Sequence, residues 1–262
     1  MGTPDAAATG ADDSGPSATL PVLVRLPDTI KACLLDMDGV LTDTASTHSR
    51  AWKRTFDEFL ERRGVVPPFD LDSDYKAYVD GKTRYDGVRG FLASREIVLP
   101  EGTPDDPAEA ESVAGIGNRK NELVQRLIAE EGVTVYEGSV RFVEEARRAG
   151  LKTAVVSSSA NTEQILEAAG ISHLFDARVD GVVIAREKLN GKPAPDSFLR
   201  AAELLEVSPE AGAVFEDALA GVEAGRAGGF GLVVGVDRHG NPQALLDHGA
   251  DIVVSDLAEL VE

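Results

Sequence analysis

A short apolar run near the N-terminus, closed by two acids, places the strongest constraint on how this chain folds. The run at 32–35 continues into Asp36-Met37-Asp38-Gly39. An apolar segment of this length, ended by aspartate and glycine, is typical of a buried strand in a parallel sheet. Proteins of the α/β class place their chemistry at the carboxyl ends of such strands. Burying Asp36 and Asp38 together is costly unless a cation or a transferable proton offsets their repulsion. The run therefore indicates a metal site, a nucleophile, or both.

From residue 139 onward, apolar strands alternate strictly with amphipathic helices, and Gly150 and Gly170 stop two of these helices. The expected strands lie at 152–156, 179–184, 213–215, 232–236 and 252–254. The expected helices lie at 139–149, 162–169, 195–205, 219–227 and 242–247. Strict alternation of this kind predicts an α/β fold with a Rossmann-like, doubly wound parallel sheet.

The connection between the first two strands is much longer than an ordinary crossover needs. It contains helical patterns at 43–63, 71–79, 84–95 and 108–131, and no strong strand. We therefore expect an inserted α-helical cap domain at 45–131, lying beside the carboxylates as a lid. The catalytic core is then discontinuous and comprises residues 29–44 and 132–262. Residues 1–28 are rich in small residues, proline and aspartate without periodicity, and are expected to be a disordered extension.

The acidic composition narrows the range of partners. A formal net charge of −19 disfavours nucleic acid and anionic membranes as ligands. An enzyme with this charge that acts on phosphates needs local cations, either basic side chains or a divalent metal. No apolar run approaches the roughly 20 residues that span a bilayer, and residues 1–20 lack a secretion signal, so a cytoplasmic location is expected. The single cysteine, Cys33, falls inside the predicted strand and is expected to pack in the core.

Acidic residues end two of the predicted strands at places where folding alone does not require them. Asp36 and Asp38 follow the first strand, and Glu216-Asp217 follow the strand at 213–215. An Asp-x-Asp pair by itself also occurs as an ordinary capping pair in strand-to-helix turns. The carboxyl ends of parallel strands share one edge of the sheet, however, so both pairs are expected to face one ligand. Mg²⁺ prefers such a shell of oxygen ligands, supplied here by the carboxylates and the Asp38 carbonyl.

A second group of polar residues has the properties of a phosphate site. Ser157 ends an apolar strand just before a helix start, where hydroxyl and backbone N–H groups hold phosphate oxygens. Ser159 and Asn161 fit phosphate binding and a simple helix N-cap about equally well. Lys192 stands next to prolines that fix its loop, which favours an ammonium group held in the site over a solvated surface charge.

These four motifs, in this order, resemble the signatures of the haloacid dehalogenase superfamily of phosphotransferases, and the match spans the whole predicted core. The resemblance implies that Asp36 is the nucleophile that becomes an aspartyl phosphate. It implies that Asp38 is the general acid and base. An inserted helical cap after the first motif is also a trait of this superfamily. The remaining implied roles are phosphoryl binding by Ser157 and Lys192, and Mg²⁺ binding by Glu216 and Asp217.

Within the superfamily, the cap sequence is similar to the β-phosphoglucomutase-like subgroup. The stretch at 43–53 looks like its hinge and first cap helix, and the stretch at 80–88 looks like its specificity loop, in which the arginine grips a distal phosphate. Without this likeness, Trp52 is a core residue, His48 a surface residue and Arg84 half of an ion pair. The turn at 156–161 departs from the subgroup, which has lysine where Ala160 stands. The substrate-binding residues implied are Thr44, His48, Trp52, Gly81, Arg84, Lys120 and Asn121.

The resemblance implies Mg²⁺-dependent interconversion of β-D-glucose 1-phosphate and glucose 6-phosphate through β-glucose 1,6-bisphosphate. A sugar-phosphate phosphatase is the alternative, because the same chemistry ends in hydrolysis when water reaches the aspartyl phosphate. A non-catalytic module that binds Mg²⁺ or a sugar phosphate is a third hypothesis. The expected partner is a small sugar phosphate, and the expected state is a monomer, with a dimer as the alternative.

Overall fold

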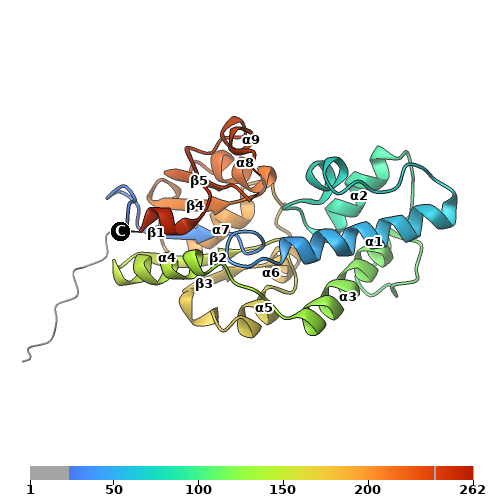
Figure 1. The fold of residues 1–262 in the computed structure, drawn as a ribbon, viewed down its shortest axis with the longest axis horizontal. Helices are drawn as coiled ribbons and strands as arrows, with labels where there is room; N and C mark the ends of the chain where they lie inside the picture. Colours follow the sequence, from blue (N-terminus) through green and yellow to red (C-terminus); the bar gives the residue numbers. More distant parts are fainter. Residues whose placement is uncertain (1–23, 239, 262) are drawn as a thin grey trace, which may run out of the picture.

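The structure, a computed structural model, describes residues 24–238 and 240–261 (Figure 1). Within these residues six strands form one parallel sheet in the order β3-β2-β1-β4-β5-β6. The chain starts in the middle of the sheet, builds one side through β2 and β3, and then returns to build the other side from β4. This confirms the predicted α/β class and Rossmann-like sheet. The strands are β1 (Ala32–Leu35), β2 (Lys152–Val156), β3 (Ala177–Val179), β4 (Gly212–Glu216), β5 (Leu232–Val236) and β6 (Ile252–Val254).

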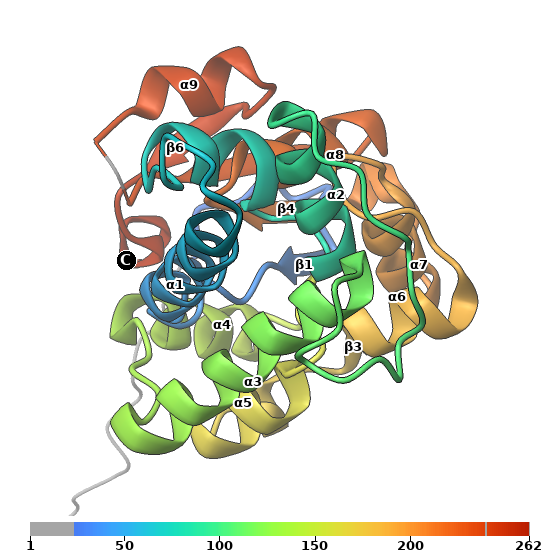
Figure 2. The same ribbon diagram turned by 90° about the vertical axis from the view of Figure 1, so that its right-hand side faces the viewer.

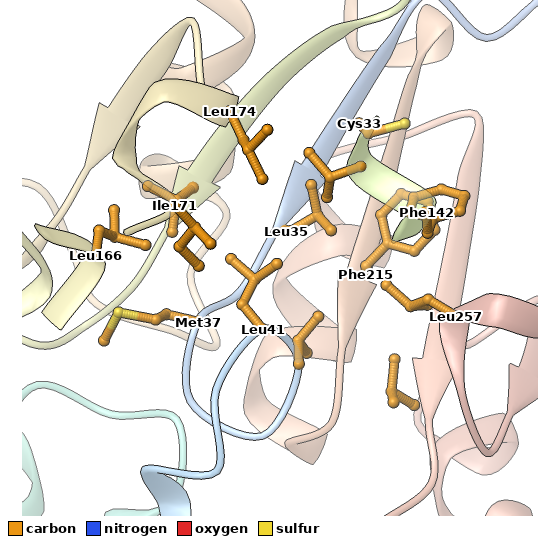
Figure 3. Packing of buried hydrophobic residues seen from close by; sticks show 14 of the residues in the cluster. Cys33, Leu35, Met37, Leu41, Phe142, Leu166, Ile171, Leu174, Phe215 and Leu257 are labelled. Atoms are coloured by element: carbon orange, nitrogen blue, oxygen red, sulfur yellow. The ribbon is translucent and has the colours of Figure 1, made fainter. Parts of the chain in front are cut away.

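Helices cover both faces of the sheet, so the central strands are apolar on both sides. Cys33 and Leu35 of β1 join a cluster that includes Phe142 and Phe215, whose ring centroids lie 5.0 Å apart (Figure 3). Leu34 points to the opposite face and joins a second cluster. Burial on both faces explains the near-continuous apolar run in the sequence. The covering helices are α4 (Glu137–Arg148), α5 (Thr162–Ala168), α7 (Asp196–Leu204), α8 (Leu219–Ala227) and α9 (Pro242–Asp247), with the short helices η2 (Ser172–Leu174), η3 (Pro209–Ala211) and η4 (Leu257–Leu260).

Residues 45–131 form a helical unit beside the carboxyl ends of the strands, seen at the right of Figure 1 and toward the viewer in Figure 2. It has its own apolar cluster, in which Phe56 and Phe91 lie with ring centroids 4.1 Å apart. The C-terminal half of α3, including Val124, instead joins the core cluster that contains Cys33 and Leu35 of β1. This contact fixes the helical unit against the sheet edge. Its elements are α1 (Ala45–Arg63), the π-helix η1 (Tyr75–Val79), α2 (Arg84–Ser94) and α3 (Val113–Glu131).

One predicted strand and part of the predicted disorder are wrong. The segment predicted as a strand at 179–184 ends β3 at Val179 and then forms α6 (Gly181–Glu187). Asp180 starts this helix, because its carboxylate accepts hydrogen bonds from the backbone N–H groups of Val182 and Val183. The predicted disorder is also wrong for residues 24–28, since Val24 forms an antiparallel bridge with Val261. Residues 1–23 of the predicted extension lie outside the described residues.

The helical unit contains less helix than the sequence predicts. The pattern at 108–131 becomes helical only at Val113, because the Ser112 hydroxyl caps the helix by accepting from Gly115 N. Of the pattern at 71–79, residues 73–79 are helical, and Tyr75–Val79 have π-type bonding. Among the described residues, no helix has the length and apolarity that a membrane crossing requires.

Candidate active site

The predicted strand ends meet at the point where the strand order reverses, between β1 and β4. Lys192, in the loop before α7, lies between Asp36 at the end of β1 and Glu216 at the end of β4. Its Nζ is 2.5 Å from Asp36 Oδ1 and 2.5 Å from Glu216 Oε1, and it donates to the Val156 carbonyl at 3.0 Å. Lys192 and Glu216 are almost fully buried. The prediction that the Lys192 ammonium is held rather than solvated is therefore confirmed.

Burial and opposite charges compete at this cluster. Burial raises the pKa of Asp36 from 3.8 to about 6 and that of Glu216 from 4.5 to about 7, and Lys192 opposes both rises. Burial also disfavours the charged form of Lys192, but the two carboxylates outweigh it and raise the Lys192 pKa. Lys192 therefore stays protonated and supplies the cation that this carboxylate cluster needs.

Three carboxylates at this edge have the donor chemistry of a divalent metal site. Asp36, Glu216 and Asp217 each offer an oxygen, and these oxygens all lie within 4.8 Å of one another. Desolvation and the neighbouring acids raise the pKa of Asp217 well above its usual range, so the cluster favours an added cation. An all-oxygen donor set fits Mg²⁺. The Asp38 side chain is outside this set, and the metal contact predicted for its carbonyl stays a prediction.

Asp38 lies beside a chain of polar groups that reaches into the helical unit. Thr44 Oγ1 donates to Asp38 Oδ1, and Ser157 Oγ lies 3.5 Å from Oδ2. His48 Nε2 is 3.7 Å from Oδ1, beyond hydrogen-bond distance. Burial raises the pKa of Asp38 above 3.8, although the bonds from Thr44 and Ser157 and the charges of Lys120 and Lys192 oppose this. A carboxyl group with a raised pKa is suited to accept and return a proton.

His48 links Asp38 to Lys120 on α3. Lys120 Nζ lies 3.0 Å from His48 Nδ1 and 4.8 Å from the centroid of the Trp52 ring. Burial, reinforced by the charge of Lys120, lowers the pKa of His48 well below 6.5, so the imidazole is neutral. When Lys120 is protonated, its ammonium can only donate to Nδ1, which leaves the ring proton of neutral His48 on Nε2, the ring nitrogen 3.7 Å from Asp38 Oδ1. Burial also lowers the pKa of Lys120 to about 7.

The polar turn after β2 ties the sheet to the helical unit. Ser157 Oγ accepts from the backbone N–H of Ser159 at 3.1 Å, and Ser159 Oγ accepts from that of Asn161 at 3.2 Å. Asn161 Nδ2 donates to Asn121 Oδ1 of α3 at 2.9 Å. Asn161 occupies the N-cap position of α5 but makes no side-chain cap bond. Its side-chain amide bonds to Asn121 of the helical unit instead.

A cavity of about 370 Å³ lies between the sheet edge and the helical unit. Four predicted residues lie behind its wall and contact the lining: Thr44 and Ser157 touch Asp38, and Lys192 and Glu216 form the buried pair beneath Asp36. The structure thus gathers all the predicted site residues, while the roles assigned to them stay a prediction. The predicted residues that line the cavity are Asp36, Asp38, His48, Trp52, Gly81, Arg84, Lys120, Asn121, Ser159, Asn161 and Asp217.

Comparison with known proteins agrees with this geometry. The sequence model of the haloacid dehalogenase-like hydrolase family matches residues 30–229. The chain belongs to this family. The β-phosphoglucomutase of Mycobacterium tuberculosis (strain CDC 1551 / Oshkosh) is 57% identical over 247 residues, which cover 91% of this chain and 94% of the relative. The β-phosphoglucomutase of Bacillus subtilis (strain 168) is 34% identical over 232 residues, covering 88% and 92%.

Solved structures of this haloacid dehalogenase-like family share the fold. The β-phosphoglucomutase of Clostridium difficile superposes with a TM-score of 0.70 at 28% identity, covering 88% of this chain and 93% of that one. The structure of CbbY from Rhodobacter sphaeroides in complex with phosphate superposes with a TM-score of 0.66 at 28% identity, covering 88% and 96%. The predicted resemblance to the superfamily and to its β-phosphoglucomutase-like subgroup is therefore confirmed.

Sequence reasoning missed several residues that line the cavity of this haloacid dehalogenase-like chain. Tyr75 and Asp80 come from the two ends of the π-helix, and Lys188 comes from the turn after α6. Burial raises the pKa of Asp80 to about 7, and the charge of Glu216 adds to this rise. The only sequence signal for Asp80 is its place before Gly81 in the predicted specificity loop. Lys188 could not be found, because it falls between the strand predicted at 179–184 and the helix predicted at 195–205, where no element was predicted.

Proposed function

We propose that this chain is a β-phosphoglucomutase, which interconverts β-D-glucose 1-phosphate and glucose 6-phosphate through β-glucose 1,6-bisphosphate. The observation that carries the proposal is one cavity that joins the carboxylates of the sheet to a cation of the helical unit. Asp36 and Asp38 line it from the sheet, and Arg84 lines it from α2. The identity to relatives named β-phosphoglucomutase supports the same conclusion.

Asp36 carries the phosphoryl group in this proposal. In one half of the cycle, the 6-hydroxyl of β-glucose 1-phosphate attacks the phosphorus of the aspartyl phosphate. The bond between phosphorus and the Asp36 oxygen breaks, and the Asp38 carboxylate takes the hydroxyl proton. After the bisphosphate has turned round, Asp36 attacks the phosphorus at C1 and the ester bond to the sugar breaks. Asp38 returns its proton to the C1 oxygen, which releases glucose 6-phosphate and regenerates the aspartyl phosphate.

The transfer concentrates negative charge at the sheet edge, and the cations of the site offset this charge. We propose that Asp36, Glu216 and Asp217 hold Mg²⁺, with the Asp38 carbonyl as a further ligand. When bound, Mg²⁺ neutralises charge on the oxygens of the transferring phosphoryl group. Lys192 fixes the Asp36 carboxylate through Oδ1 and stays charged beside it. Ser157 and the N–H groups of the turn after β2 provide further donors for phosphoryl oxygens.

A bisphosphate intermediate requires a second anion site, which we assign to Arg84 and Lys120 of the helical unit. Arg84 donates to the Tyr85 hydroxyl at 3.0 Å, and no carboxylate forms an ion pair with it among the residues that the structure describes. Its guanidinium therefore keeps donors for a phosphate, which it binds in bidentate fashion. The helical unit acts as a lid in this proposal, because excluding water protects the aspartyl phosphate from hydrolysis.

The full chain tests the proposal in an assay with Mg²⁺, β-glucose 1-phosphate and a trace of β-glucose 1,6-bisphosphate. We expect glucose 6-phosphate to form, and we expect the α anomer of glucose 1-phosphate not to replace the β anomer. Asp36→Asn should abolish both turnover and labelling of the protein by phosphate. Asp72→Asn, on the exposed surface of the helical unit, is the matched control and should retain both. Release of inorganic phosphate alone would contradict the mutase and support a phosphatase.

A further inference from the structure

We propose that Asp80 orients the substrate by accepting a hydrogen bond from a ring hydroxyl of the sugar. This inference rests on the proposed function and assigns a residue to its sugar rather than to its phosphates. Asp80 lines the cavity together with Asp36 and Asp38 but belongs to the helical unit. A carboxylate in this position accepts from hydroxyl groups and repels phosphate oxygens. It therefore discriminates between the two kinds of group that a sugar phosphate presents.

The π-helix brings Asp80 into the cavity. The backbone N–H of Asp80 donates to the Tyr75 carbonyl at 3.0 Å, which closes the wide π-type turn. Tyr75 also lines the cavity, and its side chain is hydrogen-bonded to the Asp80 carboxylate. Single π-type turns are rare and are frequent at functional sites. The π-type turn fixes the backbone of Asp80, and the tyrosine fixes the orientation of its carboxylate.

The next residue of the loop is fixed against the sheet. Ser158 Oγ donates to the Gly81 carbonyl at 2.7 Å, and an added Cβ on Gly81 would lie 3.1 Å from the Ala218 Cβ. Gly81 has a φ of +69°, a conformation that side chains disfavour. The loop therefore passes close to the turn that follows Glu216. This places the Asp80 carboxylate near the reacting edge, where the charges of Glu216 and Asp38 add to the rise of its pKa.

The specificity loop thus carries opposite charges four residues apart, with Asp80 before Gly81 and Arg84 at the start of α2. Arg84 takes the phosphate in the proposed function, while Asp80 takes a hydroxyl between the two phosphates. Because the bisphosphate must turn round between the two transfers, its two ends exchange places. This exchange swaps the C1 side of the ring with the C5 side, so the 3-hydroxyl, opposite the ring oxygen, is the ring hydroxyl that keeps nearly the same place in both orientations and meets a fixed acceptor in both.

The test is a cycle between enzyme variants and substrate analogues. Wild type, Asp80→Ala and Asp80→Asn are assayed for kcat and KM with β-glucose 1-phosphate and with its 2-deoxy, 3-deoxy and 4-deoxy analogues. Asp80→Ala should lower kcat/KM for the parent substrate about 10- to 100-fold, the size expected for one hydrogen bond to a charged group. With one of the three analogues, this loss should shrink to nearly nothing, because the hydroxyl that Asp80 binds is already missing. Asp80→Asn should lose less than Asp80→Ala, since its amide oxygen still accepts.

Phosphorylation of Asp36 by acetyl phosphate separates this inference from the proposed function. It should be equal in wild type and in the control Asp72→Asn; its failure in wild type would overturn the proposed function itself. If Asp80→Ala does not fold, the comparison of Asp80→Asn with wild type over the same analogues decides. Equal losses with the parent and all three analogues, or no loss at all, would overturn the role of Asp80. A change confined to the Mg²⁺ requirement would likewise assign Asp80 to the acidic cluster instead.

Discussion

Lys192 shows how a single buried cation makes the carboxylates of the site compatible with a folded core. It contacts Asp36 and Glu216 at 2.5 Å each and also packs with its Nζ 4.9 Å from the centroid of the Phe198 ring. Lys192→Met keeps much of the side-chain volume but leaves two buried carboxylates without their cation. Removing one partner of a buried ion pair typically costs about 3–5 kcal/mol, and we expect a loss of that order in the free energy of unfolding.

Urea denaturation in the absence of divalent metal measures this loss, with Lys31→Ala, at an exposed position, as the control. Millimolar Mg²⁺ should then stabilise Lys192→Met more than wild type, because the metal replaces part of the missing positive charge. A loss below about 1 kcal/mol would contradict the role of Lys192, since surface substitutions are usually that mild.

Arg84 makes a prediction about specificity rather than stability. Arg84→Ala removes the guanidinium that we assign to the distal phosphate, so isomerisation should fall by roughly 100-fold, as expected for charge-assisted hydrogen bonds. Phosphorylation of Asp36 by acetyl phosphate should continue, because that donor has no distal phosphate. Arg54→Ala, whose guanidinium pairs with Glu58 on the surface of α1, is the matched control. Equal loss of isomerisation and phosphorylation in Arg84→Ala would contradict the assignment.

The sequence pattern predicts a strand where helix α6 forms. The stability of this helix depends on its N-cap residue, Asp180. The Asp180 carboxylate accepts from the N–H groups of Val182 at 3.0 Å and Val183 at 2.9 Å. Asp180→Ala should destabilise the protein by about 1–2 kcal/mol in urea denaturation, the usual cost of losing an N-cap. Asp180→Asn should keep most of the stability because its amide oxygen still caps. If Asp180→Asn loses as much as Asp180→Ala, the ion pair with Arg178 is the stabilising contact instead of the cap.

The elements that the sequence predicts well are those in which pattern and environment agree. The strand at 152–156 and the helix at 219–227 have the predicted bounds, because buried parallel strands and amphipathic helices each have a distinct periodicity. The segment at 179–184 fails because Val182-Val183-Ile184 is β-branched and apolar, as strands are. Only Ile184 of these three is buried, and the cap at Asp180 outweighs the propensity.

The residues of the candidate site also differ in how well the sequence predicts them. Asp36, Lys192 and Glu216 could be predicted because each follows or precedes an element whose place in a parallel sheet is known. Asp80 could not be predicted, because its position depends on a π-type turn and on where the helical unit meets the sheet. Neither feature has a periodicity in the sequence. Long-range placement of this kind depends on tertiary packing, such as the contact of Val124 with the core cluster.

At the scale of the whole molecule, the gathered carboxylates predict an unusual dependence of stability on pH. In the folded protein burial raises the pKa of Asp36 to about 6 and those of Asp80 and Glu216 to about 7, against reference values of 3.8 and 4.5. Between about pH 4.5 and pH 7, the folded state therefore binds more protons than the unfolded state. Linkage then requires the free energy of unfolding to fall as pH rises through this window. Above about pH 7, Lys120 works in the opposite direction, because burial lowers its pKa from 10.5 to about 7.

Urea denaturation at about pH 5 and at about pH 7 measures this dependence in protein treated with EDTA and in protein with millimolar Mg²⁺. We expect the EDTA-treated protein to be less stable at the higher pH. Mg²⁺ should stabilise the protein more at pH 7 than at pH 5, because it binds the ionised carboxylates and competes with their protons. Asp80→Asn should reduce the dependence in EDTA while keeping the response to Mg²⁺, since Asp80 is outside the proposed ligand set. Stability that rises with pH across this window without metal would show that the carboxylates are already ionised, and that Lys192 alone balances them.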